Sequence, residues 1–249
     1  MTDSHAHLDA CAEPDAVVAR ASAAGVGRIV TIGTGIDSCR RALEIAERHD
    51  GVVAALGIDP HRAATSEASR VGELRPLLAH PKVVAVGETG LDGHHGADTL
   101  KEQRGLLDEH LALAESLGLP VVIHSRAASA ATAAALEPFG GTVILHCFSE
   151  PELLEPALEA GYYVSFAGNV TYPSAAELRA AAARVPADRI LVETDTPYLA
   201  PQPVRGRPNE PMNVGHTLAV LADERGEDRA ALEAQIDANA AAAFGLVDA

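Results

Sequence analysis

The chain is poor in residues that stack on bases, cross-link a fold or span a membrane. It has no tryptophan and only four phenylalanines and four tyrosines, which limits base stacking. Its three cysteines, Cys11, Cys39 and Cys147, are odd in number and scattered, so they exclude a disulfide scaffold and favour a reducing cytosol. No uncharged run of about 18 apolar residues is present, and no basic stretch precedes an apolar one at the N-terminus. These absences predict a cytoplasmic protein without membrane contact.

Positive charge is also scarce. The sequence has 19 Lys and Arg residues against 35 Asp and Glu residues, a formal net charge of −16. Such a chain repels a polyanion at long range, which argues against an extended basic surface for nucleic acid. Bound divalent cations would reverse the local field, so a phosphodiester substrate held at metal ions is not excluded.

Short apolar runs alternate with helical segments along all 249 residues. The runs are rich in β-branched residues and do not alternate with polar ones, as expected of parallel strands buried on both faces. With a short strand before His5 they make eight strand–helix units, the number that closes a barrel. The sequence therefore predicts one (β/α)8 TIM barrel domain over residues 1–249. The seven longer runs are Arg28–Gly33, Val52–Ile58, Val83–Glu88, Pro120–Ser125, Thr142–Cys147, Tyr162–Ala167 and Ile190–Asp195.

The two ends of the chain depart from the regular strand–helix repeat. Helical stretches around Val214–Asp223 and Asp228–Ala243 are expected outside the barrel or across one end of it. Only four residues precede His5, whereas a usual strand has about five or six. We therefore expect a truncated first strand, or a gene product that starts upstream.

Histidines and carboxylates follow the predicted strands, at the carboxyl ends where barrel enzymes build their sites. Period-2 alternation puts His5 and His7 on the same face, so both can reach one ion. Imidazoles with carboxylates suit zinc, manganese, iron or nickel, and with enough oxygen ligands magnesium. Six ligands are too many for one open site but divide well between two ions, with Glu88 as the natural bridge. The predicted metal ligands are His5, His7, Glu88, His124, His146 and Asp195.

Six motifs in a fixed order extend this pattern over essentially the whole chain. They are Asp3-Ser4-His5-Ala6-His7-Leu8-Asp9, Gly87-Glu88-Thr89-Gly90-Leu91-Asp92, Pro120-Val121-Val122-Ile123-His124-Ser125-Arg126, His146-Cys147-Phe148-Ser149, Glu193-Thr194-Asp195-Thr196-Pro197-Tyr198-Leu199-Ala200-Pro201 and Arg205-Gly206-Arg207-Pro208-Asn209-Glu210-Pro211. The chain thereby resembles the TatD-type metal-dependent deoxyribonucleases, amidohydrolase-like barrel enzymes. The resemblance implies two divalent-metal positions. His5, His7, Glu88 and Asp195 would hold one ion, and Glu88, His124 and His146 the other.

The chain departs from the family pattern at three places. Where the family reads Gly-x-His-Pro-His, this chain has Asp59 at the first histidine and keeps His61 at the second. The segment after Asp92 has His94 and His95 in place of the aromatic residues that the family favours, and Glu150 replaces a common glycine. These changes leave the metal ligands intact and bear on substrate preference.

For phosphodiester hydrolysis we expect Asp195 both to ligate an ion and to accept the proton of the attacking water, with Glu88 as the second catalytic residue. Glu193, one layer deeper, either orients a metal ligand or is a structural carboxylate. Tyr198 and Phe148 are candidates for base stacking or packing. Guanidinium groups match phosphate oxygens, and the predicted substrate-binding residues are Asp59, His61, Arg126, Arg205 and Arg207.

Three functions remain open on these grounds. The first is a nuclease acting on DNA ends or short oligonucleotides, exonucleolytic and monomeric, with two Mg²⁺, Mn²⁺ or Zn²⁺ ions. The second is a metal-dependent hydrolase of a small amide, ester or lactone, because the same barrel serves that chemistry. The third is a catalytically silent metal-binding or interaction protein. We expect His94 and His95 on the loop surface and Cys147 in packing, and the helical histidines in solvent: His49, His80, His110 and His216.

Overall fold

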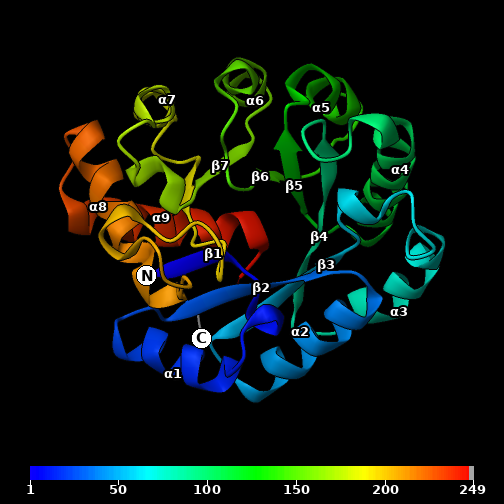
Figure 1. Ribbon diagram of the computed structural model, residues 1–249, viewed down its shortest axis with the longest axis horizontal. Helices are drawn as coiled ribbons and strands as arrows, with labels where there is room; N and C mark the ends of the chain where they lie inside the picture. The colour runs from blue at the N-terminus through cyan, green and yellow to red at the C-terminus, as the bar shows by residue number, and fades with distance from the viewer. Residues whose placement is uncertain (247–249) are drawn as a thin grey trace.

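Eight parallel strands follow one another in chain order in a computed structural model, which describes residues 1–246 (Figure 1). They confirm the predicted parallel barrel. Their bounds are β1 Thr2–Ala6, β2 Arg28–Thr34, β3 Val52–Gly57, β4 Val83–Asp92, β5 Val121–Arg126, β6 Val143–Leu145, β7 Tyr163–Phe166 and β8 Ile190–Val192. Backbone bonds close the barrel between its last and first strands. The His7 amide donates to the Thr196 carbonyl over 2.7 Å, and the Asp195 amide to the His5 carbonyl over 2.9 Å.

The helices lie around this barrel, one after nearly every strand (Figure 1). The helix after β4, α4, ends at Gly118 in the left-handed conformation. The bounds are α1 Pro14–Ala23, α2 Ile36–Arg48, α3 Leu74–Leu78, α4 Leu100–Leu117, α5 Ser129–Leu136, α6 Leu154–Glu159, α7 Ala176–Arg184, α8 Val214–Arg225 and α9 Arg229–Phe244. No helix among residues 1–246 has the length and apolarity that crossing a membrane requires.

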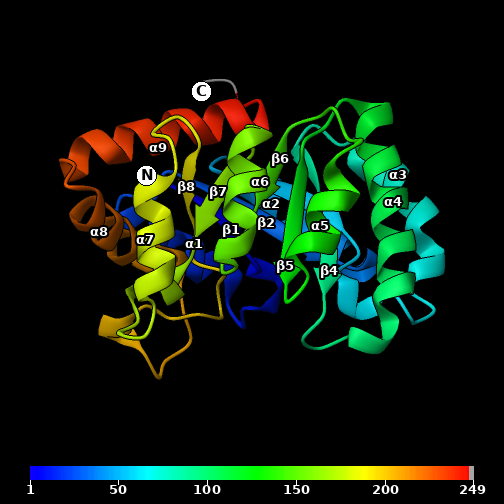
Figure 2. The same cartoon turned by 90° about the horizontal axis from the view of Figure 1, so that it is seen from above.

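Helix α9 covers the end of the barrel at which the strands begin (Figure 2). Its Phe244 packs in one apolar cluster with side chains inside the barrel, such as Val30 of β2 and Ile144 of β6. A second, larger cluster fills the space between strands and helices. The barrel interior is thus filled and is covered by α9 at the end where the strands begin, and barrel enzymes build their sites at the opposite end, where the strands finish.

The strands differ from the predicted runs where they meet the predicted ligands. The expectation of a truncated first strand was wrong, since β1 has five residues and includes His5. Strand β4 runs four residues beyond Glu88, to Asp92. In contrast, β6 and β8 end before His146 and Asp195, which lie in the loops that follow.

The register of strand pairing is irregular at two of the predicted ligands. The β1–β2 pairing shifts between Asp3 and Ala6, a step that contains His5. The β4–β5 pairing shifts between Val86 and Thr89, a step that contains Glu88. An extra residue in a strand bends it and re-aims its side chain, and such bulges are common next to active sites. Both shifts therefore fall at a predicted metal ligand, His5 on β1 and Glu88 on β4.

Candidate metal centre

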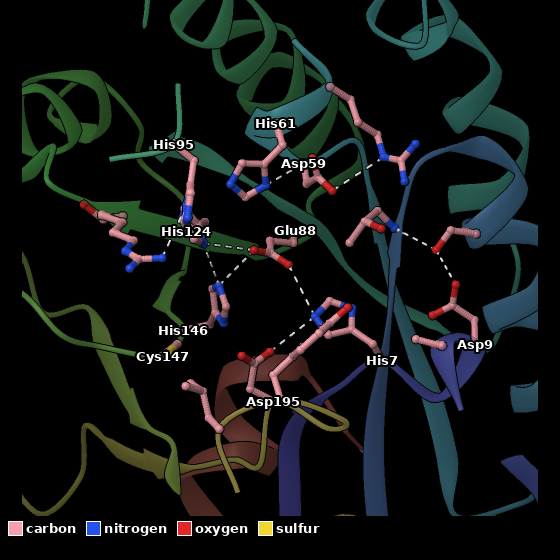
Figure 3. Close-up of a pocket in the computed structure, with 18 of the residues that line it drawn as sticks. His7, Asp9, Asp59, His61, Glu88, His95, His124, His146, Cys147 and Asp195 are labelled. Carbon is pink, nitrogen blue, oxygen red and sulfur yellow. Dashed lines mark hydrogen bonds and ion pairs between the residues drawn. The ribbon is translucent and has the colours of Figure 1, made fainter. Parts of the chain in front are cut away.

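A pocket of about 740 Å³ opens at the carboxyl ends of the strands (Figure 3). Among its walls are His7 after β1, Glu88 on β4 and His124 on β5, with His146 and Asp195 from the loops after β6 and β8. The fully buried His5 lies directly below. All six predicted metal ligands therefore meet at one place, although up to 190 residues separate them in the sequence (His5 to Asp195).

Four donor atoms form the first group. The Nε2 atoms of His5 and His7 lie 3.3 Å apart. Glu88 Oε2 is 3.6 and 3.7 Å from them, and Asp195 Oδ1 is 3.8 and 3.3 Å from them. Ligand bonds of about 2.1 Å in a tetrahedral zinc site put neighbouring donors about 3.4 Å apart. The five separations, 3.3 to 3.8 Å, are close to those expected between ligands of one divalent cation.

Three donor atoms form the second group, around the other oxygen of Glu88 (Figure 3). Glu88 Oε1 is 3.1 Å from His124 Nδ1 and 3.0 Å from His146 Nε2. The two imidazole nitrogens are 3.3 Å apart. Each carboxylate oxygen of Glu88 thus belongs to a different group of imidazoles, as expected of a bridging ligand.

Two further carboxylates contact the outer nitrogens of these histidines. Asp92 Oδ2 lies 3.1 Å from His124 Nε2, and Glu193 Oε1 lies 3.3 Å from His146 Nδ1. Such a partner leaves the inner nitrogen of each ring with a lone pair for a cation and holds the plane of the ring. Glu193, for which the sequence left two interpretations, contacts His146 in this way and also accepts from the Cys147 amide.

The acidic and basic groups of the pocket strongly shift one another's pKa values. Burial alone would raise the pKa of Glu88, but the charge on His146 and hydrogen bonds from His124 and His146 hold it well below its usual value. Burial opposes the charged form of His146, yet Glu88 and Glu193 raise the pKa of His146 well above its usual value. A cation must displace the protons of these imidazoles, so its binding releases protons and weakens as the pH falls.

The predicted substrate residues divide into two sets. Asp59, His61 and Arg126 line the pocket. Arg205 and Arg207 are exposed and do not line it, and the Arg205 guanidinium lies 4.2 Å over the Tyr172 ring. The role of all five in substrate binding stays a prediction, and the geometry favours the first three.

The two aromatic candidates also divide. Phe148 is buried against Phe166 and is therefore a packing residue. Tyr198 is 56% exposed and lines the pocket, with its ring 5.8 Å from that of His7. Only Tyr198 remains available to stack on a base.

Several side chains lie where the sequence did not place them. His95 and Cys147 line the pocket rather than only covering the loop surface or packing. His110 was expected in solvent, but it is fully buried between α4 and β3. Its Nε2 accepts a hydrogen bond from the Ile58 amide over 3.0 Å, and its Nδ1 donates to the Leu106 carbonyl over 2.7 Å. An apolar helix face accepts an imidazole when both ring nitrogens are paired.

Asp92 is the residue that sequence reasoning missed. It is fully buried, and its Oδ1 accepts from the backbone amides of His94 and His95. Its position four residues after Glu88 on an extended strand, hence on the same face, was the available signal. Gly90 between them has a φ of 144°, and a Cβ there would collide with the His124 carbonyl. Only glycine lets β4 approach β5 this closely.

A family model described as TatD related DNase matches residues 2–245. The chain belongs to the TatD-related DNase family. Membership makes it a metal-dependent hydrolase and confirms the resemblance of the six motifs.

Similar proteins agree along the full length. The chain is 41% identical to an uncharacterized metal-dependent hydrolase TatD of Mycobacterium tuberculosis, over 99% of this chain and 98% of that one. It is 40% identical to a 3'-5' ssDNA/RNA exonuclease TatD of Cronobacter sakazakii, over 92% and 91% of the two chains. A TatD homologue from Escherichia coli K12 has the same fold, with a TM-score of 0.94, 32% identity and coverage of 99% and 98%. The barrel is thus that of the TatD family.

Proposed function

We propose that this chain binds two divalent cations and hydrolyses phosphodiester bonds at the 3' ends of single-stranded DNA. The observation that supports two ions is the division of Glu88, whose oxygens contact separate imidazole groups at 3.0 to 3.7 Å. The direction and substrate are supported by the exonuclease relative of Cronobacter sakazakii at 40% identity.

The donor groups assign a ligand role to each side chain. His5, His7 and Asp195 would hold the first ion, His124 and His146 the second, and Glu88 both. When bound, such ions polarise a phosphate and lower the pKa of a coordinated water. Asp195 also borders the open pocket, with 13% of its side chain exposed, so its free carboxylate oxygen can accept the proton of an attacking water.

Two arginines of the pocket supply positive charge for a phosphate. Arg62 and Arg126 line the pocket, and both are exposed. A guanidinium presents paired N–H donors that match phosphate oxygens, so these arginines would hold the bond next to the one cleaved. Tyr198 at the rim offers one face to a terminal base.

One observation favours a different substrate. Asp59 places a carboxylate on the pocket wall, with Oδ2 3.5 Å from Arg62 Nε, where the family pattern has an imidazole. A carboxylate repels a phosphate and occupies an arginine. The second candidate is therefore hydrolysis of a small amide, ester or lactone, for which a pocket of about 740 Å³ is large enough.

The test uses metal-stripped protein with a single-stranded oligonucleotide labelled at its 5' end. We expect Mg²⁺, Mn²⁺ or Zn²⁺ to restore stepwise shortening, and a blocked 3' end to prevent it. The matched control is the same oligonucleotide with the block at its 5' end, which should be shortened normally. Failure of every metal to restore cleavage, together with turnover of a small ester or lactone, would replace the first candidate by the second.

A further inference from the structure

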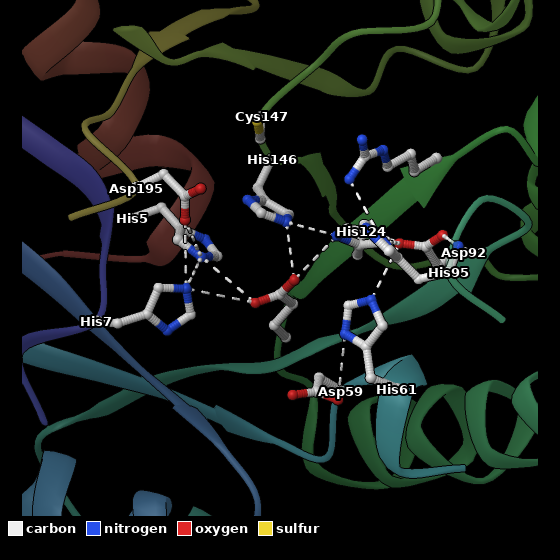
Figure 4. Close-up of polar contacts among 12 residues, drawn as sticks. His5, His7, Asp59, His61, Asp92, His95, His124, His146, Cys147 and Asp195 are labelled. Carbon is white, nitrogen blue, oxygen red and sulfur yellow. Dashed lines mark hydrogen bonds and ion pairs between the residues drawn. The ribbon is translucent and has the colours of Figure 1, made fainter. Parts of the chain in front are cut away.

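A third group of potential ligands lies on the pocket wall, next to the two groups around Glu88. It consists of His61, Asp92 and His95, whose ligand atoms lie within 4.8 Å of one another (Figure 4). Asp92 Oδ2 is 3.0 Å from His61 Nε2 and 3.2 Å from His95 Nδ1. These separations match those within the two groups that we assign to cations. None of the six proposed ligands belongs to this third group.

The hydrogen bonds of His95 cannot all be satisfied as they stand. Its Nδ1 faces the acceptor Asp92 Oδ2 at 3.2 Å and the donor Nη1 of Arg126 at 3.4 Å. A guanidinium only donates, so Nδ1 must have a lone pair for Arg126 and a proton for Asp92. One atom cannot have both. A cation between Nδ1 and Asp92 would use the lone pairs of both atoms, and the exposed Arg126 side chain is free to turn away.

The neighbours of His61 prepare the same site. Asp59 Oδ1 lies 3.7 Å from His61 Nδ1 and has no hydrogen-bond partner among the described residues. A carboxylate on this side places the ring proton on Nδ1 and leaves the Nε2 lone pair directed at Asp92, the arrangement seen in histidines that bind metals. His61 is 45% exposed and His95 is 52% exposed, so the remaining coordination positions open into the pocket.

Both relevant departures from the family pattern surround this group. Asp59 replaces an imidazole and supplies a carboxylate beside His61. His95 replaces an aromatic residue and supplies a ligand nitrogen. We propose that His61, Asp92 and His95 form a third divalent-cation site that is open to the pocket. Two imidazoles and one carboxylate favour borderline ions such as Zn²⁺, Ni²⁺ or Co²⁺ over Mg²⁺.

The test counts bound ions and does not depend on what the enzyme cleaves. Full-length protein is stripped with chelator, loaded with Zn²⁺, separated from free metal and measured for zinc per chain. The variants are His95→Ala and His61→Ala, with His94→Ala as the matched control. His94 is adjacent and exposed but has no side-chain contact with Asp92.

We expect the wild type and His94→Ala to bind the same number of ions, and His95→Ala and His61→Ala each to bind one fewer. Equal counts in all four proteins would overturn the proposal. So would a loss from His94→Ala, a loss from only one cluster variant, or a loss of two ions. Because Glu88 is unchanged in these proteins, failure of the third site leaves the two-ion proposal to its own test.

Discussion

Glu88 shows how much one side chain can organise. It is buried and anionic, and its two oxygens face four imidazole nitrogens. A buried carboxylate in these surroundings is stable only while positive charge, from protons or from cations, lies on both sides of it.

Replacing Glu88 by alanine should therefore affect both proposed ions. We expect Glu88→Ala to weaken the binding of both ions. The loss of affinity should exceed the roughly 10–100-fold caused by removing a group that only hydrogen-bonds to a metal ligand. Metal content per chain, measured after gel filtration, tests this. Glu109→Ala, an exposed change on α4, is the control and should keep the wild-type content. A Glu88→Ala protein with two tightly bound ions would remove the bridging role.

At the residue scale, the sequence predicted which ligands meet at one end of the barrel. It predicted less well which other residues contact them. Four of the six ligands could be named because each lies at or near the end of an apolar strand-like run, and His5 and His7 because they share one face of the first strand. The contacts of Asp92 and His95 were harder to predict, because they depend on β4 continuing past Glu88 and on the loop turning back over Asp92. Those are consequences of tertiary contact between β4 and β5.

At the scale of elements, α4 is joined to β3 by a buried side chain as well as by apolar packing. His110 accepts from the Ile58 amide at the end of β3, and burial lowers the pKa of His110 from 6.5 to about 4. Between pH 6.5 and about pH 4, His110 therefore binds a proton in the unfolded chain but not in the folded protein. This contribution to stability is complete above pH 6.5, decreases as the pH falls and is lost by about pH 4.

His110→Gln should reduce this pH dependence. The glutamine carbonyl can still accept from Ile58 but does not titrate. Between pH 7.5 and 5 we expect the free energy of unfolding of the wild type to fall by about 2 kcal/mol more than that of His110→Gln. Urea unfolding at both pH values measures it, with the exposed His216→Gln on α8 as control. Equal pH dependence in His110→Gln and the wild type would show that another group is responsible.

At the scale of the whole molecule, the barrel concentrates negative charge on a chain that already has a net charge of −16. Glu88, Asp92, Glu193 and Asp195 converge at one end and are balanced by imidazoles. Without cations, part of that balance must come from protons on the histidines. Cations that bind only the folded chain stabilise it by mass action.

Chelation should therefore lower the thermal stability of the native protein. A free ion concentration of 100 times Kd adds about 2.7 kcal/mol, which corresponds to several degrees in a barrel of this size. Differential scanning fluorimetry with and without a chelator measures the change. In Glu88→Ala the same chelator should have a clearly smaller effect. An unchanged midpoint in the native protein would mean that the site is not linked to folding.

The sequence by itself determined the order of strands and helices, the barrel, the family and the six residues at the strand ends. These depend on local hydrophobic patterns and motifs that neighbouring residues suffice to specify. Only the tertiary structure decided which nitrogen faces which oxygen, that Arg205 and Arg207 lie off the pocket, that His110 is buried and that His95 joins Asp92. Such pairings depend on bulges, strand lengths and loop conformations, which are set by packing between segments far apart in the chain.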